Sequence, residues 1–182
     1  MTIFRKAIVT DVDAIAQLVN SAYRGESSHA GWTTEADLLD GLRTSADEIK
    51  QLIAAESALI LLCWNDAALM GSICIEKAQD TAHIGMFVVN PTSQGQGIGK
   101  QLLAAAENLT QQTWAVQTYQ IHVITLRHEL IAFYERRGYQ RTGILTEFPV
   151  NDAVWQPKRA GLQLEILEKS SRNKVTLDLR RN

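Results

Sequence analysis

The chain has 182 residues, of which 46% are hydrophobic, and its 18 basic and 20 acidic residues give a formal net charge of −2. This length and apolar content suit one compact globular domain, and no run of basic residues would follow a nucleic-acid backbone, so nucleic acid is not an expected partner. No segment approaches the roughly 18 consecutive apolar residues of a membrane-spanning helix. Charges also interrupt residues 1–16 too often for a signal peptide. We therefore expect a cytoplasmic protein with no membrane partner.

The first half of the chain is predicted to open with a strand and a helix and then to form three strands in succession. Residues 2–9 alternate in a β-rich pattern, after which Thr10 and Asp11 mark a helix start. A polar stretch at 23–33 precedes helical patterns around 36–42 and 46–55. The next strand patterns are separated by turn residues and cover 58–64, 68–76 and 83–90. Short links of this kind predict an antiparallel meander.

The second half of the chain alternates helices with strands. A glycine-rich segment at 94–99 leads into a helix whose apolar residues follow helical spacing. The later elements are a strand at 119–126, a helix at 129–137, and strands at 139–146 and 162–167. Residues 170–182 are expected to form a tail or an extra edge strand. The resulting order, βααβββαβαββ, predicts the α/β (α+β) class with a mixed sheet and helices.

The two cysteines, Cys63 and Cys74, lie inside apolar strand patterns. They lack the spacing of metal ligands or of a redox pair. We therefore interpret them as core residues and expect no metal cofactor.

The segment at 86–100 has the composition of a phosphate-binding turn. It consists of a buried strand, a turn at Asn90-Pro91 and glycines that open an amphipathic helix. Glycines let the backbone turn tightly and approach a ligand, while the free N–H groups at a helix start attract phosphate oxygens. On this stretch alone, a glycine-rich turn without a ligand is the alternative.

Two other phosphate motifs are excluded by counting. A dinucleotide fingerprint that starts at Gly95 would need glycine at position 100, which is Lys100. A P-loop that ends at Lys100 would need glycine at 94 and Ser or Thr at 101, but these residues are Gln94 and Gln101. Neither nucleotide motif is therefore present.

The remaining pattern, Gln94-x-x-Gly97-x-Gly99, resembles the acetyl-CoA signature of the GCN5-related N-acetyltransferase (GNAT) superfamily. The downstream segment Phe133-Tyr134-Glu135-Arg136-Arg137-Gly138-Tyr139 resembles a second motif of that family at the usual distance. The predicted order of strands and helices also resembles the family fold from residue 2 to residue 169. The resemblance implies a single N-acetyltransferase domain over residues 1–169. It also implies a mostly antiparallel sheet of six to seven strands flanked by about four helices.

The resemblance implies that acetyl-CoA is the cosubstrate and that the strand at 83–90 and the turn after it bind this molecule. The backbone of Phe87 and Val89 would pair with the pantetheine arm in a slot where this strand separates from the strand at 119–126. The residues implied in cofactor binding are Phe87, Val88, Val89, Gln94, Gly95, Gln96, Gly97, Ile98, Gly99 and Lys100. The amides from Gln94 to Lys100 would hold the pyrophosphate, and a backbone N–H in the slot can polarise the thioester carbonyl.

One position departs from the family pattern. Many relatives carry Asn seven positions before the motif tyrosine, where this chain has Arg127. Arg127 can still contact the cofactor, which is the role we expect, or a carboxylate on the acceptor. Solvation of Arg127 at a helix start is the alternative.

Acyl transfer to an amine requires a proton acceptor for the amine and a proton donor for the departing thiolate. Tyr134 matches the tyrosine that serves as general acid in many members of the family. A phenol with an ordinary pKa near ~10 also stays protonated at neutral pH. Packing of the Tyr134 ring beside Phe133 is the alternative.

His83 is the candidate base. It lies eleven residues before Gln94, where some histone-acetylating relatives carry a catalytic Glu, and strand parity predicts that it shares a face with Phe87 and Val89. A histidine with an ordinary pKa near ~6.5 suits proton removal around neutral pH. A purely structural role for His83 is the first alternative. The other candidate bases are Glu76, His122, Glu147 and water.

The resemblance places the acceptor beside the loop at 23–33. Tyr23, Arg24 and Trp32 are the candidate acceptor-binding residues in this loop, with packing or solvated surface as the alternative for each. An arginine there would suit an acceptor that carries a carboxylate.

The predicted function is transfer of an acetyl group from acetyl-CoA to a primary amine of a small molecule, directly within a ternary complex. The alternative is a CoA-binding sensor domain that has lost turnover. A structural module without a small ligand conflicts with two motifs in register. The sequence leaves open a homodimer, a longer acyl group and an oxygen acceptor.

Overall fold

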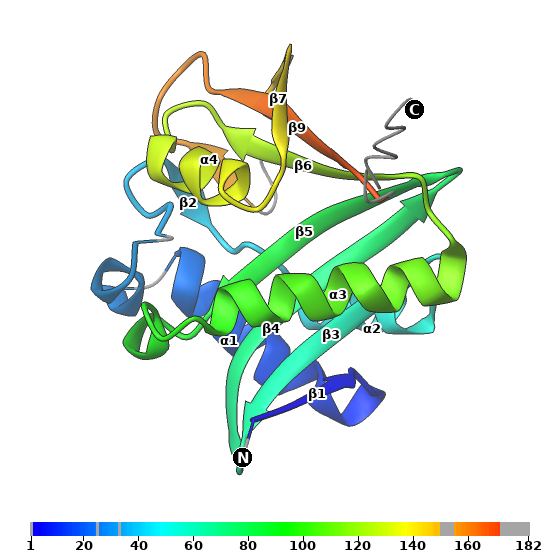
Figure 1. Cartoon of the computed structure of the whole chain (residues 1–182). Helices are drawn as coiled ribbons and strands as arrows, with labels where there is room; N and C mark the ends of the chain where they lie inside the picture. The colour runs from blue at the N-terminus through cyan, green and yellow to red at the C-terminus, as the bar shows by residue number, and fades with distance from the viewer. Residues whose placement is uncertain (1, 25, 33, 150–154, 172–182) are drawn as a thin grey trace, which may run out of the picture.

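A seven-stranded sheet forms the centre of the molecule (Figure 1). The computed structural model describes residues 2–24, 26–32, 34–149 and 155–171. The strands of the sheet are β1 (Thr2–Lys6), β3 (Ala58–Asn65), β4 (Ala68–Ala78), β5 (Thr81–Val89), β6 (Thr118–Ile124), β7 (Gln140–Glu147) and β9 (Gln163–Ser170). They lie in the order β1-β3-β4-β5-β6-β9-β7, and all neighbours are antiparallel except β5 and β6, which are parallel.

Within the described part of the chain, four α-helices pack on the two faces of this sheet. They are α1 (Val12–Tyr23), α2 (Ala46–Ala54), α3 (Ile98–Trp114) and α4 (His128–Glu135). Figure 1 shows α3 in front of β3, β4 and β5, with α1 and α2 behind them. Three short 3-10 helices cover Val9–Asp11, Glu26–Ala30 and Pro91–Ser93. Among the described residues, no helix is both long enough and apolar enough to cross a membrane.

The strand β3 shows why the central strands are apolar almost throughout. Leu59 and Leu61 join the core beneath α3, whereas Ile60 and Leu62 join the core beneath α1 and α2. Since successive side chains of a strand point to opposite faces, a strand covered on both faces must be apolar at every position. Cys63, at 0% exposure, is a core residue, as is Cys74, and the prediction for both cysteines is confirmed.

The predicted fold class and the element order βααβββαβαββ are confirmed, with two short strands in addition. These are β2 (Leu39–Gly41) and β8 (Trp155–Pro157), which pair antiparallel in a small second sheet. The helical pattern expected at 36–42 is wrong, because Leu39 is buried against Ile124 and Leu162 in a satellite cluster. Of the predicted tail or edge strand, Ser170 ends β9 and residues 172–182 lie outside the described residues.

A bulge in β5 changes which side chains face which helix. Gly85 is opposite Cys74 and Val88 is opposite Ser72, so Met86 and Phe87 together face the single residue Ile73. Met86 has a positive φ of 41°, which is uncommon for a non-glycine residue. Because the extra residue reverses the alternation, Ile84 packs beneath α3 while Met86 packs beneath α1 and α2.

The start of α1 is fixed to β1 by a buried carboxylate. The side chain of Asp11 accepts two hydrogen bonds from Arg5, at 2.7 and 2.8 Å, and one from the backbone N–H of Ile8 at 2.8 Å. Asp11 is only 6% exposed, whereas the Arg5 side chain is 40% exposed. The hydrogen bonds from Arg5 lower the pKa of Asp11 below its ordinary value of 3.8. The ion pair between Arg5 and Asp11 therefore stabilises the fold at pH values above the ordinary pKa of Asp11.

We predict that Asp11→Asn lowers the free energy of unfolding at pH 7 by about 1–2 kcal/mol, less than for a fully buried pair because Arg5 is partly exposed. The folded-state pKa is depressed, so this stabilisation is present above the ordinary pKa and is lost as the pH falls through the folded-state value. Denaturant unfolding at pH 7 and at pH 3 measures the difference. The matched control is Asp13→Asn, an exposed carboxylate on the same helix turn. Equal effects of the two substitutions at pH 7 would contradict the prediction.

Candidate active site

The strands β5 and β6 pair over only part of their lengths. The parallel pairing joins Thr81–Ile84 to Thr118–Ile121 and stops there. Beyond Ile84 the two strands separate, and two cavities lie along the opening. The slot predicted between these strands is therefore present, and the bulge at Met86 lies at the point where it opens.

The first cavity, here called the polar cavity, has a volume of about 340 Å³. Its lining includes Tyr23, Arg24, Glu35, His83, Phe87 and Tyr134. The second, here called the glycine-turn cavity, has a volume of about 250 Å³. Its lining includes Trp32, Phe87, Gln94, Gly97, Lys100 and Arg137. Phe87 and Leu130 line both cavities, so the two spaces meet at these side chains.

The start of α3 lines the glycine-turn cavity. Gly95 and Gly97 have φ values of +82° and +81°, in the left-handed region that favours glycine. A Cβ would meet nothing within 4 Å at Gly95 and only a side-chain atom of Gln101 at Gly97, so backbone conformation rather than space requires glycine. The first helical bond of α3 is donated by Gln101 to Gly97. No acceptor among the described residues binds the N–H groups of Gly95 to Lys100, which are therefore available to an anion. The N–H of Gln94, expected to belong to this set, instead donates to the carbonyl oxygen of Pro91.

The side chain of Gln94 connects this turn to the loop after α1. Its Nε2 donates to the carbonyl oxygen of Val89 at 3.1 Å, and its Oε1 accepts from the backbone N–H of Trp32 at 2.9 Å. The amide also occupies the space beside Gly31, where a Cβ would come within 2.8 Å of it. Gln94 therefore holds the loop against the end of β5.

Trp32 lines a different cavity from the one expected. It was predicted to contact the acceptor, but the structure places it in the lining of the glycine-turn cavity, with its ring 5.6 Å from that of Phe133. The reason is the bond from its backbone to Gln94, which draws this part of the loop toward the glycine turn. Trp32 is thus a candidate contact of the cofactor rather than of the acceptor.

Arg137 is a candidate cofactor residue that the sequence analysis did not single out. It lines the glycine-turn cavity, and its guanidinium lies 3.4 Å from the centre of the Phe133 ring. Burial lowers the pKa of Arg137, and its Nε is buried with no hydrogen-bond partner in the described part of the chain. A buried donor without an acceptor suits an anionic ligand. The only sequence signal was its place inside the second motif.

Tyr134 is the tyrosine whose hydroxyl is left free for the polar cavity. The chain has four tyrosines. The hydroxyl group of Tyr23 donates to the carbonyl oxygen of Phe87 at 3.0 Å. The hydroxyl groups of Tyr119 and Tyr139 both donate to Glu107, to its carbonyl oxygen at 2.7 Å and to its Oε1 at 2.8 Å respectively. No acceptor among the described residues binds the hydroxyl of Tyr134, although its ring is buried and packs at right angles to that of Phe133. Burial raises its pKa, so the hydroxyl stays protonated.

His83 lines the polar cavity, but the parity argument that selected it is wrong. Because of the bulge at Met86, the side chain of His83 lies on the opposite face from that of Phe87. Its ring is in edge contact with that of His122, at 6.3 Å between centroids. Burial and the neighbouring His83 lower the pKa of His122. Glu76 and His122 also line this cavity, and Glu147 does not.

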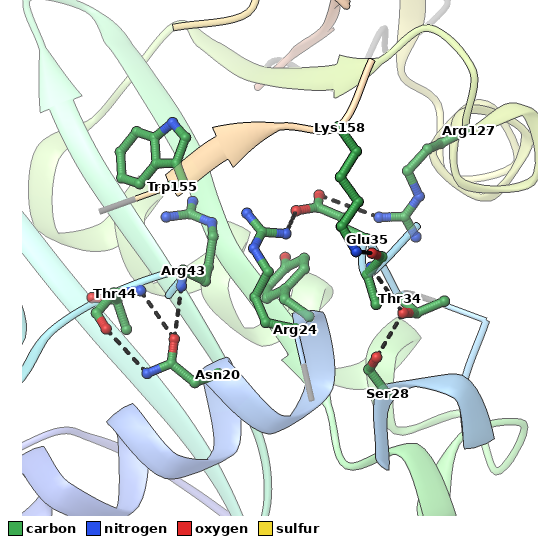
Figure 2. A network of polar contacts seen from close by, with 12 residues as sticks. Asn20, Arg24, Ser28, Thr34, Glu35, Arg43, Thr44, Arg127, Trp155 and Lys158 are labelled. Atoms are coloured by element: carbon green, nitrogen blue, oxygen red, sulfur yellow. Dashed lines mark hydrogen bonds and ion pairs between the residues drawn. The ribbon is translucent and has the colours of Figure 1, made fainter. Parts of the chain in front are cut away.

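Arg24 and Arg127 meet on one carboxylate at the wall of the polar cavity (Figure 2). Arg24 Nη1 donates to Glu35 Oε2 at 2.5 Å, and Arg127 Nη1 lies 3.4 Å from Glu35 Oε1. Arg127 also donates to the carbonyl oxygen of Trp32 at 3.2 Å. Arg127 is 9% exposed, so it is not a solvated residue. It lines the polar cavity and not the glycine-turn cavity, contrary to its expected place beside the cofactor, because Glu35 holds its guanidinium there.

Comparison with known proteins agrees with this geometry. The family model described as acetyltransferase (GNAT) domain matches residues 38–157. A search among curated proteins found no match. The solved structures that resemble this fold include the ribosomal-protein-S18-alanine N-acetyltransferase of Escherichia coli, with 16% identity over 95% of this chain and 96% of that one and a TM-score of 0.69.

Two similar structures contain the cofactor. The PaiA N-acetyltransferase of Thermoplasma acidophilum, in complex with coenzyme A, is 17% identical over 93% of this chain and 99% of that one, with a TM-score of 0.65. YncA of Salmonella typhimurium, with acetyl-CoA, is 14% identical over 98% of this chain and 99% of that one, with a TM-score of 0.68. At these low sequence identities, the similarity to the solved structures establishes the fold alone. The family is established by the family model, which matches most of the chain. The chain therefore belongs to the GNAT acetyltransferase family.

Proposed function

We propose that residues 1–169 form one acetyltransferase domain that transfers an acetyl group from acetyl-CoA to a primary amine of a small molecule, directly within a ternary complex. The observation that carries this proposal is the meeting of two chemically different cavities at Phe87 and Leu130. One ends at the free N–H groups of a helix start, and the other contains Tyr134 and His83. This arrangement suits two substrates that react where the cavities join.

The glycine-turn cavity fits the phosphate end of acetyl-CoA. The amides of Gly95 to Lys100 offer donors at a helix N-terminus, and Lys100 and Arg137 add positive charge to the same lining. The edge of β5 beyond Ile84, which β6 does not cover, would face the pantetheine arm. The carbonyl oxygens of Phe87 and Val89 on this stretch accept hydrogen bonds from the side chains of Tyr23 and Gln94, which a pantetheine arm paired there would have to replace. Acetyl-CoA, when bound, supplies the acetyl group in activated form as a thioester.

Two residues that line the polar cavity would move the protons. Tyr134 lies beside Phe87 at the junction, and His83 lies at the end where β5 and β6 are still paired. His83, or a water beside it, takes a proton from the amine of the acceptor, which makes the nitrogen nucleophilic. Tyr134 holds a proton on its Oη for the leaving sulfur. Burial raises the pKa of Tyr134, so its hydroxyl is protonated at neutral pH and can donate to that sulfur. A backbone N–H of the separated part of β5 would stabilise negative charge on the acetyl oxygen.

Mass spectrometry tests the proposal directly. The protein is incubated with isotope-labelled acetyl-CoA and a metabolite extract, and a labelled acetylated amine is expected among the products. Calorimetry with CoA is carried out in parallel. CoA binding without acetylation of any amine would reject the enzyme and favour a CoA-binding sensor domain.

Gly97→Leu is predicted to abolish CoA binding with the fold retained. A leucine side chain at φ +81° strains the turn and displaces the amides that face the phosphates. Calorimetry measures affinity, and circular dichroism checks folding. The control is Gly143→Leu, which imposes a similar strain at φ +77° outside both cavities. Unchanged affinity of Gly97→Leu would exclude the turn as the phosphate site.

Tyr134→Phe is predicted to lower turnover by about 10²-fold or more, because it removes only the hydroxyl. Affinity for acetyl-CoA should stay nearly constant. The control, Tyr139→Phe, removes a hydroxyl from a ring 5.6 Å away that is bound to Glu107, and it should retain turnover. The acid role fails if Tyr134→Phe turns over within a factor of about two of the parent while chemistry limits the rate.

His83→Ala is predicted to lower turnover and to alter the rising limb of the pH profile, since a base acts only after losing its proton. The control is His128→Ala, an exposed histidine outside both cavities. Steady-state rates from pH 5 to pH 9 provide the comparison. An unaltered profile and magnitude would assign proton removal to water.

A further inference from the structure

The wall of the polar cavity holds more positive than negative charge. Three guanidinium groups line it, from Arg24 at the end of α1, Arg43 after β2 and Arg127 at the start of α4. The carboxylates in the same lining are Glu35 and Glu76, and the other titratable groups are His83, His122, Tyr23 and Tyr134. Three positive charges therefore face two negative ones.

The carboxylates are unevenly placed among these charges. Glu35 is shared by Arg24 and Arg127, and the three side chains are 14%, 6% and 8% exposed. Glu76 is exposed and lies on β4 opposite His83, at the end where β5 and β6 are still paired. Buried charges are costly unless neutralised and hydrogen-bonded. One carboxylate thus compensates two buried arginines, which leaves this part of the wall short of negative charge.

Arg43 adds a positive charge to the same part of the wall without adding a negative one. Its backbone N–H donates to Asn20 Oδ1 at 2.8 Å, and its guanidinium lies 5.7 Å from the centre of the Tyr23 ring. No carboxylate in the described part of the chain forms an ion pair with it. Figure 2 shows the guanidinium of Arg43 beside that of Arg24, below Trp155. Like charges side by side repel each other, so an anion bound between these two groups would be stabilised.

Arg24 also has an unused donor at this place. Its Nε is buried, and no acceptor among the described residues binds it. A buried N–H without an acceptor is costly, and native structures satisfy nearly all such groups. A planar guanidinium binds a carboxylate through two parallel hydrogen bonds. The Nε of Arg24, which no acceptor among the described residues binds, is therefore suited to an oxyanion ligand.

We propose that the acceptor is a small amine that also carries a carboxylate, and that Arg24 and Arg43 bind this carboxylate. The inference rests on the proposed acetyl transfer and adds the class of acceptor. A single negative charge matches the one excess positive charge of the described wall. A cavity of about 340 Å³ suits a molecule of amino-acid size, with its amine toward Tyr134 and its carboxylate toward the arginines.

The test compares acids with their amides as acceptors. Each standard α-amino acid, β-alanine and 4-aminobutyrate is paired with its carboxamide, and acetylation by labelled acetyl-CoA is measured for both. At least one acid should be acetylated with kcat/KM about tenfold or more above that of its amide, the scale of a lost charge-assisted hydrogen bond. Equal rates for every pair, or preferred acetylation of O-phosphoethanolamine, would overturn the proposal.

Arg43→Gln identifies the residue responsible. It removes a cation that has no carboxylate partner, so it leaves no buried charge unpaired, whereas Arg24→Gln would disturb Glu35. The acid's KM should rise about tenfold or more, the ratio of acid to amide should fall toward one, and the CoA affinity should stay constant. Arg136→Gln, at an exposed arginine outside both cavities, is the matched control and should leave the ratio unchanged. An unchanged ratio in Arg43→Gln would reject Arg43 as the carboxylate ligand.

A binding measurement distinguishes failure of the proposed acetyl transfer from failure of the proposed carboxylate site. Calorimetric titration of the same acids and amides into the CoA-saturated protein does not depend on turnover. Binding of an acid but not its amide, without acetylation, would retain the carboxylate site and reject the enzyme. Acetylation of amines without preference for the acids would retain the enzyme and reject the carboxylate site. Failure of all acids to bind or react would reject the carboxylate site as well.

Discussion

The separation of β5 from β6 after Ile84 is the constraint on which the rest of the site depends. Two parallel strands that stayed paired would satisfy each other's backbone groups and leave no space between them. The bulge at Met86 turns β5 at this point and reverses the alternation of its side chains. As a result, Phe87 stands at the junction of the two cavities, and Met86 and Val88 instead anchor the strand in the core beneath α1 and α2. Strand pairing thus decides both the opening and the faces of the residues around it.

The loop after α1 joins the two sides of this opening. The side chain of Gln94 binds the loop at Trp32, while Arg127 binds both Trp32 and Glu35. The end of β5, the start of α4 and the loop are therefore held in one network of polar contacts. A change in any of these contacts would alter the relative positions of both cavities. The motif residue Gln94 has a structural role here in addition to its place in the glycine turn.

The cluster around Glu35 is difficult to explain as a stabilising feature alone. Buried ion pairs generally gain little net stability, because desolvation offsets their attraction. Two arginines on one carboxylate, with a third arginine nearby and an unbound Nε, are less favourable still. A buried donor without an acceptor in a native structure calls for a partner, and an anionic ligand would supply one. The free hydroxyl of Tyr134 in the same cavity follows the same logic, since the other three tyrosines have their hydroxyl groups bound.

By itself, the sequence determined the fold class, the order of the elements and the glycine turn, because these depend on local patterns. Apolar residues at periods of two and 3.6 set the strands and helices, and Gly95 and Gly97 are required by positive φ. The tertiary structure alone decided the position of β9 between β6 and β7, the short pairing of β2 with β8, and the bulge at Met86. These features depend on residues far apart in the chain. For the same reason, the positions of Trp32 and Arg127 could not be predicted from the sequence. Trp32 is held by a hydrogen bond to Gln94, and Arg127 by an ion pair with Glu35. Both partners are distant in the chain, and spacing along the sequence does not encode such contacts.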